Sequence, residues 1–459
     1  MRILVINGSP KGKDSVTLQT VNYLKALFSE HSFDVLHAGQ RIRGFERDFS
    51  AAKTALEAAD LILFCYPVYT FLVPAQLHRF IDLIEESGAD VAGKFATQLS
   101  TSKHFYDTTA HRFIADRCAD LGLRYVRGLS ADMEDLLHKQ GQHEAETFFR
   151  HVLWNIEHGY SERPSVEERG QAASPVIAST ASAMPTAGEV FHVALVTDFD
   201  PQAPEPALLA LIDRFQARLQ GSATCELINL HEFPFAGGCL GCFNCASDGT
   251  CIYKDGFDDY LRQHINSADA VVYAYTVCHH SMGYRFKLYD DRQFCNGHRT
   301  VTMGKPVGYL VDGDLAAEEN LRTLMEARAQ VGGNYLVGVA TDATNPDAEV
   351  DQLAETLAYV VRHHYEQPKN FYGVGGMKIF RDLIYQMQGL MKEDHRFYKQ
   401  HGFYKDFPQR RKGTILGMYL VSALMANKTL RKRSKVSMTD GMLMPYRMII
   451  EKAQKARAR

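Results

Sequence analysis

The fold is decided at the N-terminus, where residues 1–17 read Met-Arg-Ile-Leu-Val-Ile-Asn-Gly-Ser-Pro-Lys-Gly-Lys-Asp-Ser-Val-Thr. The apolar run 3–7 predicts a buried strand, and the apolar spacing of residues 18–27 predicts a helix. A glycine- and hydroxyl-rich loop that feeds a helix N-terminus offers N–H groups and the positive end of the helix dipole to a phosphate. The loop lacks the spacing of a P-loop or of G-x-G-x-x-G, which disfavours ATP and classical dinucleotides. The stretch therefore predicts an anion site at the edge of a sheet.

Strands alternate with helices on both sides of a polar stretch, an alternation typical of parallel sheets covered by helices. The polar stretch, residues 161–189, is rich in Ser, Ala, Pro, Glu and Thr, and we predict a linker there. The chain is thus expected to be an α/β protein with two doubly wound parallel five-stranded sheets. The expected strands are 3–7, 34–37, 61–66, 95–100 and 125–128, then 192–197, 224–229, 270–275, 306–311 and 335–339.

The two halves also align in sequence. Residues 59–62 (Ala-Asp-Leu-Ile) match 268–271 (Ala-Asp-Ala-Val), and counting on without a gap places Asp82 on Asp291. The offset stays between 209 and 211 in later strands, but is only about 190 at the first strand. We infer a tandem duplication in which the second half carries roughly twenty extra residues ahead of its third strand.

Four cysteines lie in this insertion, within residues 237–251, Gly-Gly-Cys-Leu-Gly-Cys-Phe-Asn-Cys-Ala-Ser-Asp-Gly-Thr-Cys. Thiolates at this C-x2-C-x2-C-x5-C spacing can enclose one compact metal centre. We predict a [4Fe-4S] cluster; structural zinc is the alternative, although it usually uses two separated cysteine pairs, and unligated thiols are a third reading. The predicted metal ligands are Cys239, Cys242, Cys245 and Cys251.

The cysteine content and the N-terminus also bear on location. The chain has nine cysteines, and it starts with a short apolar run that reads as a strand rather than a secretory signal. A disulfide framework is therefore not expected, and a cytoplasmic location is.

Two further loops follow predicted strands of the first half. Residues 66–82 bring aromatic side chains and prolines to the carboxyl end of a central strand, where ligands of open parallel sheets bind. Residues 101–111 add hydroxyls, aromatics and imidazoles at the same edge. Ordinary loop packing is the plainer interpretation of each, but three loops converge on one edge.

These residues carry a resemblance to a known family. Gly8-Ser9-Pro10-Lys11 with Ser15 and Thr17, followed by Pro67-Val68-Tyr69, resembles the NADPH-dependent FMN reductase family of the flavodoxin-like fold. The Gly-Cys-Leu-Gly-Cys-Phe-Asn-Cys stretch resembles the iron–sulfur flavoprotein branch of that family. The resemblance implies two tandem flavodoxin-like sheets of strand order 2-1-3-4-5, with FMN as cofactor and NAD(P)H as an electron donor.

The resemblance also implies roles for matching positions. Ser9, Lys11, Ser15, Val16 and Thr17 would hold the FMN phosphate. Pro67, Val68, Tyr69, Thr70 and Phe71 would line the ribityl chain and isoalloxazine, and Thr101, Ser102, His104 and Tyr106 would close the far side. Of these, His104 and Tyr106 are our candidates for catalytic groups.

The second half departs from this pattern. Where the first half has its phosphate loop, residues 197–205 hold three carboxylates, which would repel a phosphate, so no second FMN is expected there. Each half thus keeps what the other lacks. We expect the halves to dock as an intramolecular pseudo-dimer, in which the cluster of the second half exchanges single electrons with the flavin of the first.

The expected organisation is residues 1–160 as an FMN-binding domain, 161–189 as the linker, 190–365 as the cluster-bearing domain with a degenerate flavin site, and 366–459 as a helical basic extension. The net charge is -3, yet residues 392–459 hold 17 Lys and Arg against 5 Asp and Glu. Such a tail suits an acidic protein or a membrane surface, with a solvated arm on the acidic body as the plainer interpretation. The run 415–426 is too short to cross a bilayer. Nucleic acid is not expected, whereas further homo-oligomerisation is compatible with the family.

The leading functional interpretation is an FMN- and iron–sulfur-dependent oxidoreductase that uses NAD(P)H or a reduced carrier and passes electrons to a small-molecule acceptor or a redox protein. An electron-transfer flavoprotein without a small-molecule substrate is the alternative from a different class. A zinc-stabilised NAD(P)H:flavin or quinone reductase is a third, and a non-catalytic binding module is a fourth.

Overall fold

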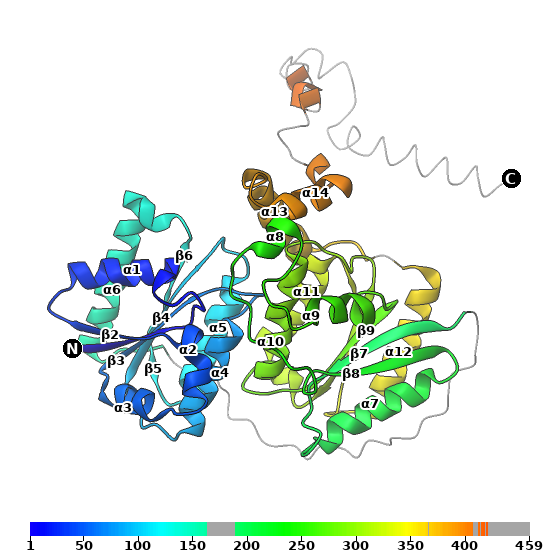
Figure 1. Ribbon diagram of the computed structural model, residues 1–459, viewed down its shortest axis with the longest axis horizontal. Helices are drawn as coiled ribbons and strands as arrows, with labels where there is room; N and C mark the ends of the chain where they lie inside the picture. The colour runs from blue at the N-terminus through cyan, green and yellow to red at the C-terminus, as the bar shows by residue number, and fades with distance from the viewer. Residues whose placement is uncertain (163–188, 366, 407–411, 414, 418, 421–459) are drawn as a thin grey trace, which may run out of the picture. The chain divides into compact units, whose positions relative to one another are not determined.

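The computed structural model describes residues 1–162, 189–365, 367–406, 412–413, 415–417 and 419–420. The predicted linker therefore falls largely outside the described residues. The chain forms two compact units, Met1–Phe397 and Tyr398–Arg459. The larger unit contains both predicted sheets (Figure 1). In the smaller unit, the Tyr398 ring packs on Phe403 and Tyr404, with ring centroids 4.8 and 6.1 Å apart.

The strands lie close to where the sequence predicts them. Runs of buried Ile, Leu and Val form most of the central strands of each sheet, as expected for strands covered on both faces. They are β1 (Arg2–Asn7), β2 (Ser32–Leu36), β3 (Leu61–Pro67), β4 (Phe95–Ser102), β5 (Arg124–Tyr125), β6 (Leu129–Asp132), β7 (Phe191–Thr197), β8 (Ala223–Asn229), β9 (Ala270–Thr276), β10 (Pro306–Asp312) and β11 (Tyr335–Thr341).

The helices connect these strands. They are α1 (Val16–Leu27), α2 (Ala38–Phe45), α3 (Ser50–Ala58), α4 (Ala75–Glu86), α5 (Asp107–Asp120), α6 (Lys139–His158), α7 (Pro206–Leu219), α8 (Asn244–Asp248), α9 (Phe257–Tyr260), α10 (Gly283–Arg292), α11 (Glu319–Gly332), α12 (Pro346–His363), α13 (Phe371–Gln386) and α14 (Lys392–Gln400). None of the helices in the described part of the chain combines the length and apolar character needed to span a membrane.

Both sheets are parallel and have the predicted strand order. The first runs β2-β1-β3-β4-β5, and the second runs β8-β7-β9-β10-β11, which is 2-1-3-4-5 in each half. The predicted fifth strand of the first half, 125–128, is split, since β5 ends at Tyr125 and β6 resumes at Leu129, both beside β4. A Cβ on Gly128 would overlap Gln98, so the backbone passes tightly over β4 at this break.

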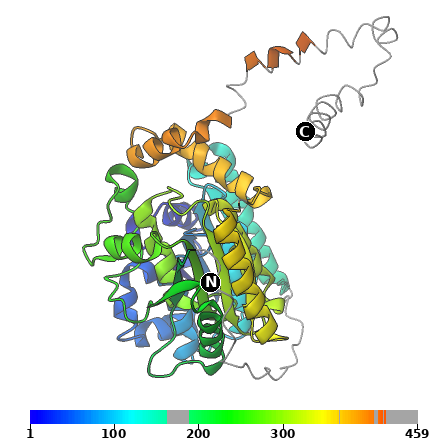
Figure 2. The ribbon, with the colours of Figure 1, turned by 90° about the vertical axis from the view of Figure 1, so that its right-hand side faces the viewer.

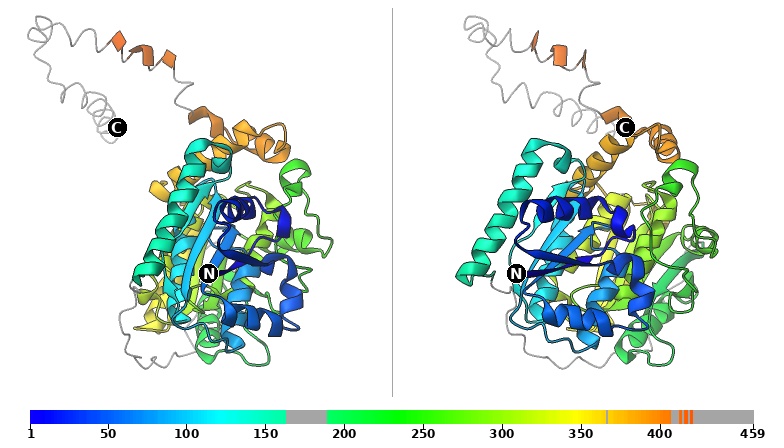
Figure 3. Two further views of the ribbon diagram at one scale, coloured as in Figure 1. Left: turned by 90° about the vertical axis from the view of Figure 1, so that its left-hand side faces the viewer. Right: turned by 60° about the vertical axis from the view of Figure 1, so that its left-hand side comes forward.

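Helices cover both faces of each sheet. In the first half, α1 and α6 bury Leu18, Val21 and Phe149 against one face of the sheet (Figure 3). In the second half, α7 and α12 bury Phe215 and Leu353 in the same way (Figure 2). The other faces turn toward one another, because α4 packs on α10 and α5 packs on α11.

The duplication is visible at the loop after the third strand of each half. Tyr69 and Leu72 form an isolated antiparallel bridge, and Cys278 and Ser281 form the same bridge 209 residues later. The two residues inside each bridge have left-handed backbones: φ is 42° and 68° at residues 70 and 71, and 50° and 62° at residues 279 and 280. Four strained non-glycine residues at matching positions are a specific feature of a common origin.

The two halves contact one another through these loops. His78 Nε2 on α4 lies 2.8 Å from Ser281 Oγ, and at the matching position of the second half Lys287 Nζ donates to the Tyr69 carbonyl at 2.8 Å. Asp291, which aligns with Asp82, accepts from the Ala75 amide at 2.8 Å. The predicted docking of the two halves as a pseudo-dimer is therefore built from reciprocal contacts.

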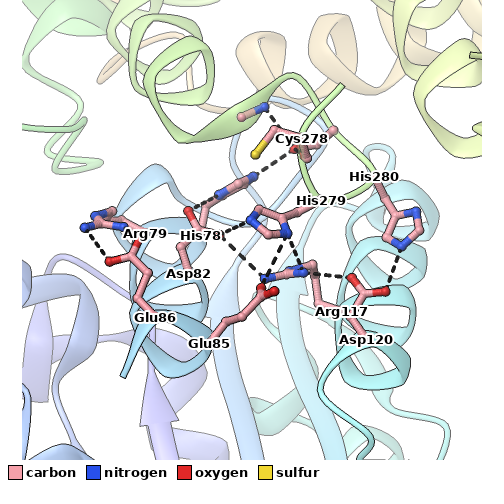
Figure 4. A network of polar contacts seen from close by, with 12 residues as sticks. His78, Arg79, Asp82, Glu85, Glu86, Arg117, Asp120, Cys278, His279 and His280 are labelled. Carbon is pink, nitrogen blue, oxygen red and sulfur yellow. Dashed lines mark hydrogen bonds and ion pairs between the residues drawn. The ribbon is translucent and has the colours of Figure 1, made fainter. Parts of the chain in front are cut away.

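One side of this interface is strongly ionic. Figure 4 shows Arg117 of α5 directed at the 278–280 loop, where it lies 2.8 Å from His279 Nδ1 and also bonds Glu85. His280 lies 3.1 Å from Asp120 and 3.0 Å from Glu318. Hydrogen bonds to these two carboxylates raise the pKa of His280 to about 10, so the charged imidazolium bridges the halves at neutral pH.

Candidate functional site

One cavity lies at the carboxyl edge of the first sheet. Three parts of the chain form it: the loops of the first half, the cysteine loop of the second half, and α13. The cavity encloses about 200 Å³, and its space continues through an open mouth into solvent.

Most residues that the sequence singled out line this cavity. Those from the first half are Ser9, Lys11, Ser15, Val16, Thr17, Pro67, Val68, Tyr69, Thr70, Thr101 and Ser102. Those from the second half are Cys239, Cys242, Cys245 and Cys251. The two sets, more than 130 residues apart in sequence, thus share one space.

The loop after β1 suits a phosphate group. Ser15 caps α1, its Oγ accepting from the Leu18 amide at 3.4 Å. The remaining N–H groups of the first turn form the positive end of the helix dipole. Thr17 Oγ1 lies 2.6 Å from Thr101 Oγ1, so the loops after β1 and β4 are joined. The lining of this corner is made of hydroxyls and Lys11 rather than carboxylates.

The loop after β3 forms one wall of the cavity. Tyr69 N donates to the Leu72 carbonyl at 2.8 Å, which closes the turn that holds Thr70 and Phe71 in left-handed conformations. Burial, with smaller effects of Cys239 and Asp291, raises the pKa of Tyr69 well above its ordinary value. Tyr69 is therefore a neutral phenol at physiological pH.

Three predicted residues lie behind the wall rather than along the cavity. The Phe71 ring packs on Phe105 and Tyr106, with centroids 5.0 and 4.6 Å away. Tyr106 donates to the Tyr372 carbonyl at 2.7 Å, and His104 Nδ1 lies 2.9 Å from Asp107 Oδ2. Phe105, between His104 and Tyr106, lines the cavity in their place. The catalytic roles of His104 and Tyr106 stay predictions.

The base of the cysteine loop is pinned by one buried ion pair. Arg292 makes two bonds to Asp255, at 2.7 and 2.8 Å, and a third to the Gly237 carbonyl at 3.0 Å. Asp255 also accepts from the Ala236 amide at 2.9 Å. Burial of Asp255 opposes ionisation, but the bonds from Arg292 and Ala236 prevail and hold its pKa at about 2. Both ends of the loop are thus held by one guanidinium–carboxylate pair.

The tip of the cysteine loop packs against the first half. Gln76 Nε2 lies 3.4 Å from the Cys239 carbonyl, and the Lys11 ammonium lies 5.7 Å from the centre of the Phe243 ring. A Cβ atom on Gly241, where φ is 61°, would overlap the Tyr69 hydroxyl. The thiol-bearing loop and the loops predicted to bind flavin are therefore in direct contact.

The thiols themselves are free, and no disulfide joins any of the nine cysteines. Burial raises the pKa of Cys239 well above its ordinary value and that of Cys245 to about 12. Within the described residues, no three His, Cys, Asp or Glu side chains converge closely enough to hold a single metal ion. Four thiols along one cavity wall nevertheless form a donor set suited to soft metals.

A fifth thiol joins this wall. Cys295, four residues after Asp291, is 3% exposed and lines the cavity. Burial raises the pKa of Cys295 well above its ordinary value, with smaller contributions from Asp258 and Cys251. Cys295 lies outside the clustered cysteines 239–251, and the only sequence signal that points to it is its closeness to Asp291, which aligns with Asp82.

The second half has a different pocket at the matching place. Its lining includes Asp198, Glu205, Asp82, Glu86 and Cys278. Burial raises the pKa of Asp198 to about 7, so part of its population is uncharged at neutral pH. An acidic lining of this kind is a poor phosphate site.

The first part of the chain is similar to a known protein family. Residues 1–111 match the family model described as NADPH-dependent FMN reductase. The iron-sulfur flavoprotein of Archaeoglobus fulgidus is 27% identical over 174 residues, which cover 36% of this chain and 79% of that protein.

Solved structures give further likenesses. The NAD(P)H:quinone oxidoreductase from Methanothermobacter marburgensis is 15% identical, with a TM-score of 0.28 over 36% of this chain and 99% of that chain. The flavoenzyme NAD(P)H:(acceptor) oxidoreductase from Paracoccus denitrificans is 21% identical, with a TM-score of 0.27 over 34% of this chain and 97% of that chain. The fold assignment rests on the strand order of the chain itself. The match to the NADPH-dependent FMN reductase family model is confined to residues 1–111, the part of the chain that carries the loops after β1, β3 and β4.

Proposed function

We propose that the chain is an FMN- and iron–sulfur-dependent oxidoreductase that moves electrons between NAD(P)H or a reduced carrier and an acceptor. The observation that carries the proposal is the shared cavity, which is lined both by the phosphate loop of the first half and by four cysteines of the second. The assignment as a flavin-dependent NAD(P)H oxidoreductase follows from the family match. The iron–sulfur cluster is supported by the similarity to the iron-sulfur flavoprotein of Archaeoglobus fulgidus and by the thiols of this chain.

The first half would bind FMN. FMN supplies hydride-accepting and single-electron chemistry when bound. Ser9, Ser15 and Thr17 would donate hydrogen bonds to its phosphate, and Lys11 would balance the charge. Pro67, Val68 and Tyr69 would wall the ring and exclude water from it, while Thr101 and Ser102 would close the opposite side. His104 and Tyr106 stay our candidate catalytic groups, and this role requires that their side chains, which bond Asp107 and the Tyr372 carbonyl, turn toward the cavity.

The second half would bind a [4Fe-4S] cluster, with zinc as the alternative. A cluster supplies single-electron chemistry when bound. Cys239, Cys242, Cys245 and Cys251 would be the ligands, and their protons would leave on metal binding, because a coordinating thiol is deprotonated. The Arg292–Asp255 pair would hold the loop in place during assembly of the site.

One flavin per chain is the expected stoichiometry. The pocket of the second half that matches the flavin site has Asp198 and Glu205 where a phosphate would sit. Carboxylates there oppose an anionic cofactor.

The test is cofactor analysis of protein purified without oxygen. One FMN and about four irons with four sulfides per chain are expected, from the [4Fe-4S] assignment. Replacement of Cys239 and Cys245 by Ser should remove the iron, whereas replacement of the remote Cys118, buried in α5, should not. Zinc without iron would contradict the cluster, and absence of FMN would contradict the whole proposal.

A second function, electron transfer between proteins without a small-molecule substrate, is favoured by the surface of the cysteine loop. Cys242 is exposed, Phe243 is 38% exposed and Ile252 is 51% exposed, so this loop presents apolar side chains to a protein partner. Steady-state oxidation of NAD(P)H with small acceptors separates the two functions. A pure carrier would turn over only when a redox protein is supplied.

The basic C-terminal region is proposed to contact an acidic protein or membrane surface. The support is its charge, 17 Lys and Arg against 5 Asp and Glu in residues 392–459. Co-sedimentation with anionic vesicles at low and high salt is the test, and salt-independent binding would contradict it.

A further inference from the structure

Helix α13 lies outside the family match but packs within the larger unit. Asn370 caps it, since its Oδ1 accepts from the Tyr372 amide at 3.0 Å, and the Asn370 amide donates to Gln330 Oε1 at 2.9 Å. A Cβ on Gly376 would lie 2.6 Å from Val331 Cγ2 and 3.0 Å from Phe105 Cε2. The glycine allows α13 to approach both α11 of the second half and the 103–106 loop of the first.

This docking brings two side chains of α13 to the cavity. Phe380 and Leu383 line it, one turn apart on the same helix face. Both side chains are partly exposed, whereas Ile384 beside them is fully buried against the body. Phe380 and Leu383 are therefore open to a molecule in the cavity.

Phe380 joins a chain of rings along the cavity wall. Its ring stacks on Phe105 at 4.1 Å between centroids and lies edge-on to His298 at 4.9 Å. His298 continues to Phe294 at 5.8 Å, and Phe294 to Tyr69 at 6.3 Å. We call these five rings, Tyr69, Phe294, His298, Phe380 and Phe105, the aromatic collar. It draws on both halves and on α13, and all five rings line the cavity.

A residue that follows α13 in sequence, Asp394, holds one ring of the collar in position. Asp394 is fully buried; its Oδ2 lies 2.9 Å from His298 Nδ1 and accepts from the His298 amide at 3.2 Å. A Cβ on Gly297, where φ is 63°, would overlap this carboxylate. The segment after the second sheet thus sets the position of two collar rings, Phe380 and His298.

The charges around the collar are already paired. Lys103 Nζ lies 2.8 Å from Asp132, and Arg292 is held by Asp255. Little positive charge remains on this side of the cavity to bind an anion, in contrast to the phosphate corner with Lys11. The collar offers ring faces and edges, which favour a flat aromatic or quinonoid molecule through offset or edge-on stacking.

We propose that Phe380, with Leu383, is a specificity-determining residue that admits a flat, uncharged ring acceptor to the flavin edge. Reduction of such an acceptor rests on the proposed function, whereas its binding to the collar does not. Truncation of Phe380 removes a ring face and widens the collar. Affinity for a small ring acceptor should fall, while ring systems too bulky for the native collar should gain access.

The test compares Phe380→Ala with Phe371→Ala in the complete, flavin-loaded chain. Phe371 begins the same helix and is 84% exposed, so it controls for loss of a helical phenylalanine. With menadione as acceptor, we expect Phe380→Ala to raise KM about tenfold. KM for NADPH and the rate with ferricyanide, an anion that needs no collar, should stay unchanged. Phenanthrenequinone, an uncharged quinone bulkier than menadione, should be reduced faster by Phe380→Ala than by wild type.

A binding measurement decides the question without turnover. Calorimetric titration of menadione should show the same roughly tenfold loss for Phe380→Ala, a smaller loss for Leu383→Ala, and none for Phe371→Ala. Equal menadione affinity for Phe380→Ala and Phe371→Ala would overturn the inference, as would a rise in KM confined to NADPH. Absence of flavin from the wild type would instead contradict the proposed function. If Phe380→Ala binds no flavin, Phe380→Leu, which keeps most of the volume but loses the ring, replaces it in the same comparison.

Discussion

The Tyr69 hydroxyl occupies the space that a Cβ on Gly241 would need. Tyr69 belongs to the loop after the third strand of the first half, and Gly241 lies between the first two cysteines of the second. The contact leaves no room for a side chain between the loop after β3 and the cysteine loop. It ties the two proposed cofactor sites together at the level of single atoms.

Gly241→Ala should displace the cysteine loop from Tyr69. The new methyl group would overlap the phenol oxygen, and φ of 61° disfavours any residue with a Cβ. We expect the iron content per chain to fall at least severalfold, with FMN retained. Gly256→Ala is the matched control, because φ is 80° there but no heavy atom lies within 4 Å of the new Cβ.

Tyr69→Phe provides the rescue for this experiment. It removes the overlapping oxygen, so the Gly241→Ala, Tyr69→Phe double variant should regain part of the iron lost by Gly241→Ala alone. The nearest remaining ring atom, Cζ, is 3.0 Å from the new Cβ, so recovery should be incomplete. Equal iron content in the Gly241→Ala and Gly256→Ala variants would show that backbone strain, rather than the Tyr69 contact, matters.

Ser15→Asp should separate phosphate binding from ring binding. Ser15 is 1% exposed at the N-terminus of α1, and a carboxylate there would repel a phosphate. We expect FMN affinity to fall by about tenfold to a hundredfold, and riboflavin, which has no phosphate, to bind as before. Fluorescence titration of the flavin-free protein measures both, with the exposed Ser50→Asp as control. Parallel losses for FMN and riboflavin would refute the phosphate assignment.

Asp291→Asn should destabilise the protein more than Asp82→Asn, although the two positions are equivalent by duplication. Asp291 is fully buried, pairs with Lys287 at 2.5 Å and accepts from the Ala75 amide. Its replacement leaves the buried Lys287 ammonium without its carboxylate, which should lower the free energy of unfolding by about 3–5 kcal/mol. Asp82 Oδ1 already lacks a hydrogen-bond partner, and Arg117 retains Glu85 and Asp120. Urea unfolding of both variants is the measurement. A larger loss from Asp82→Asn would contradict this account of the interface.

The elements most accurately predicted from sequence are the strands, since runs of Ile, Leu and Val need no partner to be recognised. The aligned pair Asp82 and Asp291 predicted the duplication, which the matched left-handed loops confirm. The interrupted fifth strand could not be predicted, because the break depends on how closely Gly128 passes over Gln98.

Some residues of the cavity lining could be predicted from the sequence and others could not. Local motifs supplied Ser15, Tyr69 and the four clustered cysteines, because each lies in a loop with its own spacing signal. Cys295 and Phe380 were missed as site residues, since only packing between distant segments brings them to the cavity. Phe105 was also missed, and His104 and Tyr106 were predicted instead. His104 and Tyr106 have left-handed backbones, and residue type alone does not show which side chains of such a turn face the cavity.

Stability should fall in mild acid because of His111. Burial lowers the pKa of His111 to about 4, from an ordinary value of 6.5. As pH falls, the unfolded chain binds this proton first, so the contribution of His111 is complete above pH 6.5 and is lost between 6.5 and 4. We expect wild type to lose roughly 2 kcal/mol more than His111→Gln between pH 7 and pH 5.

Trp154 makes the measurement specific to the first half. It is the single tryptophan of the chain and lies in α6, so its fluorescence during urea unfolding reports on the half that contains His111. The same pH dependence in wild type and in His111→Gln would show that other groups cause the acid sensitivity.

We propose that one cavity, shared by the two halves, holds both FMN and the cluster. The decisive experiment is anomalous diffraction at the iron absorption edge, on crystals of the protein purified without oxygen. We expect an iron peak beside the Sγ atoms of Cys239 and Cys245, and flavin density between Ser15 and Tyr69 in the same cavity. Iron located away from the cysteine loop, a zinc signal in its place, or flavin bound beside Asp198 in the second half would show that the two cofactors do not share this cavity.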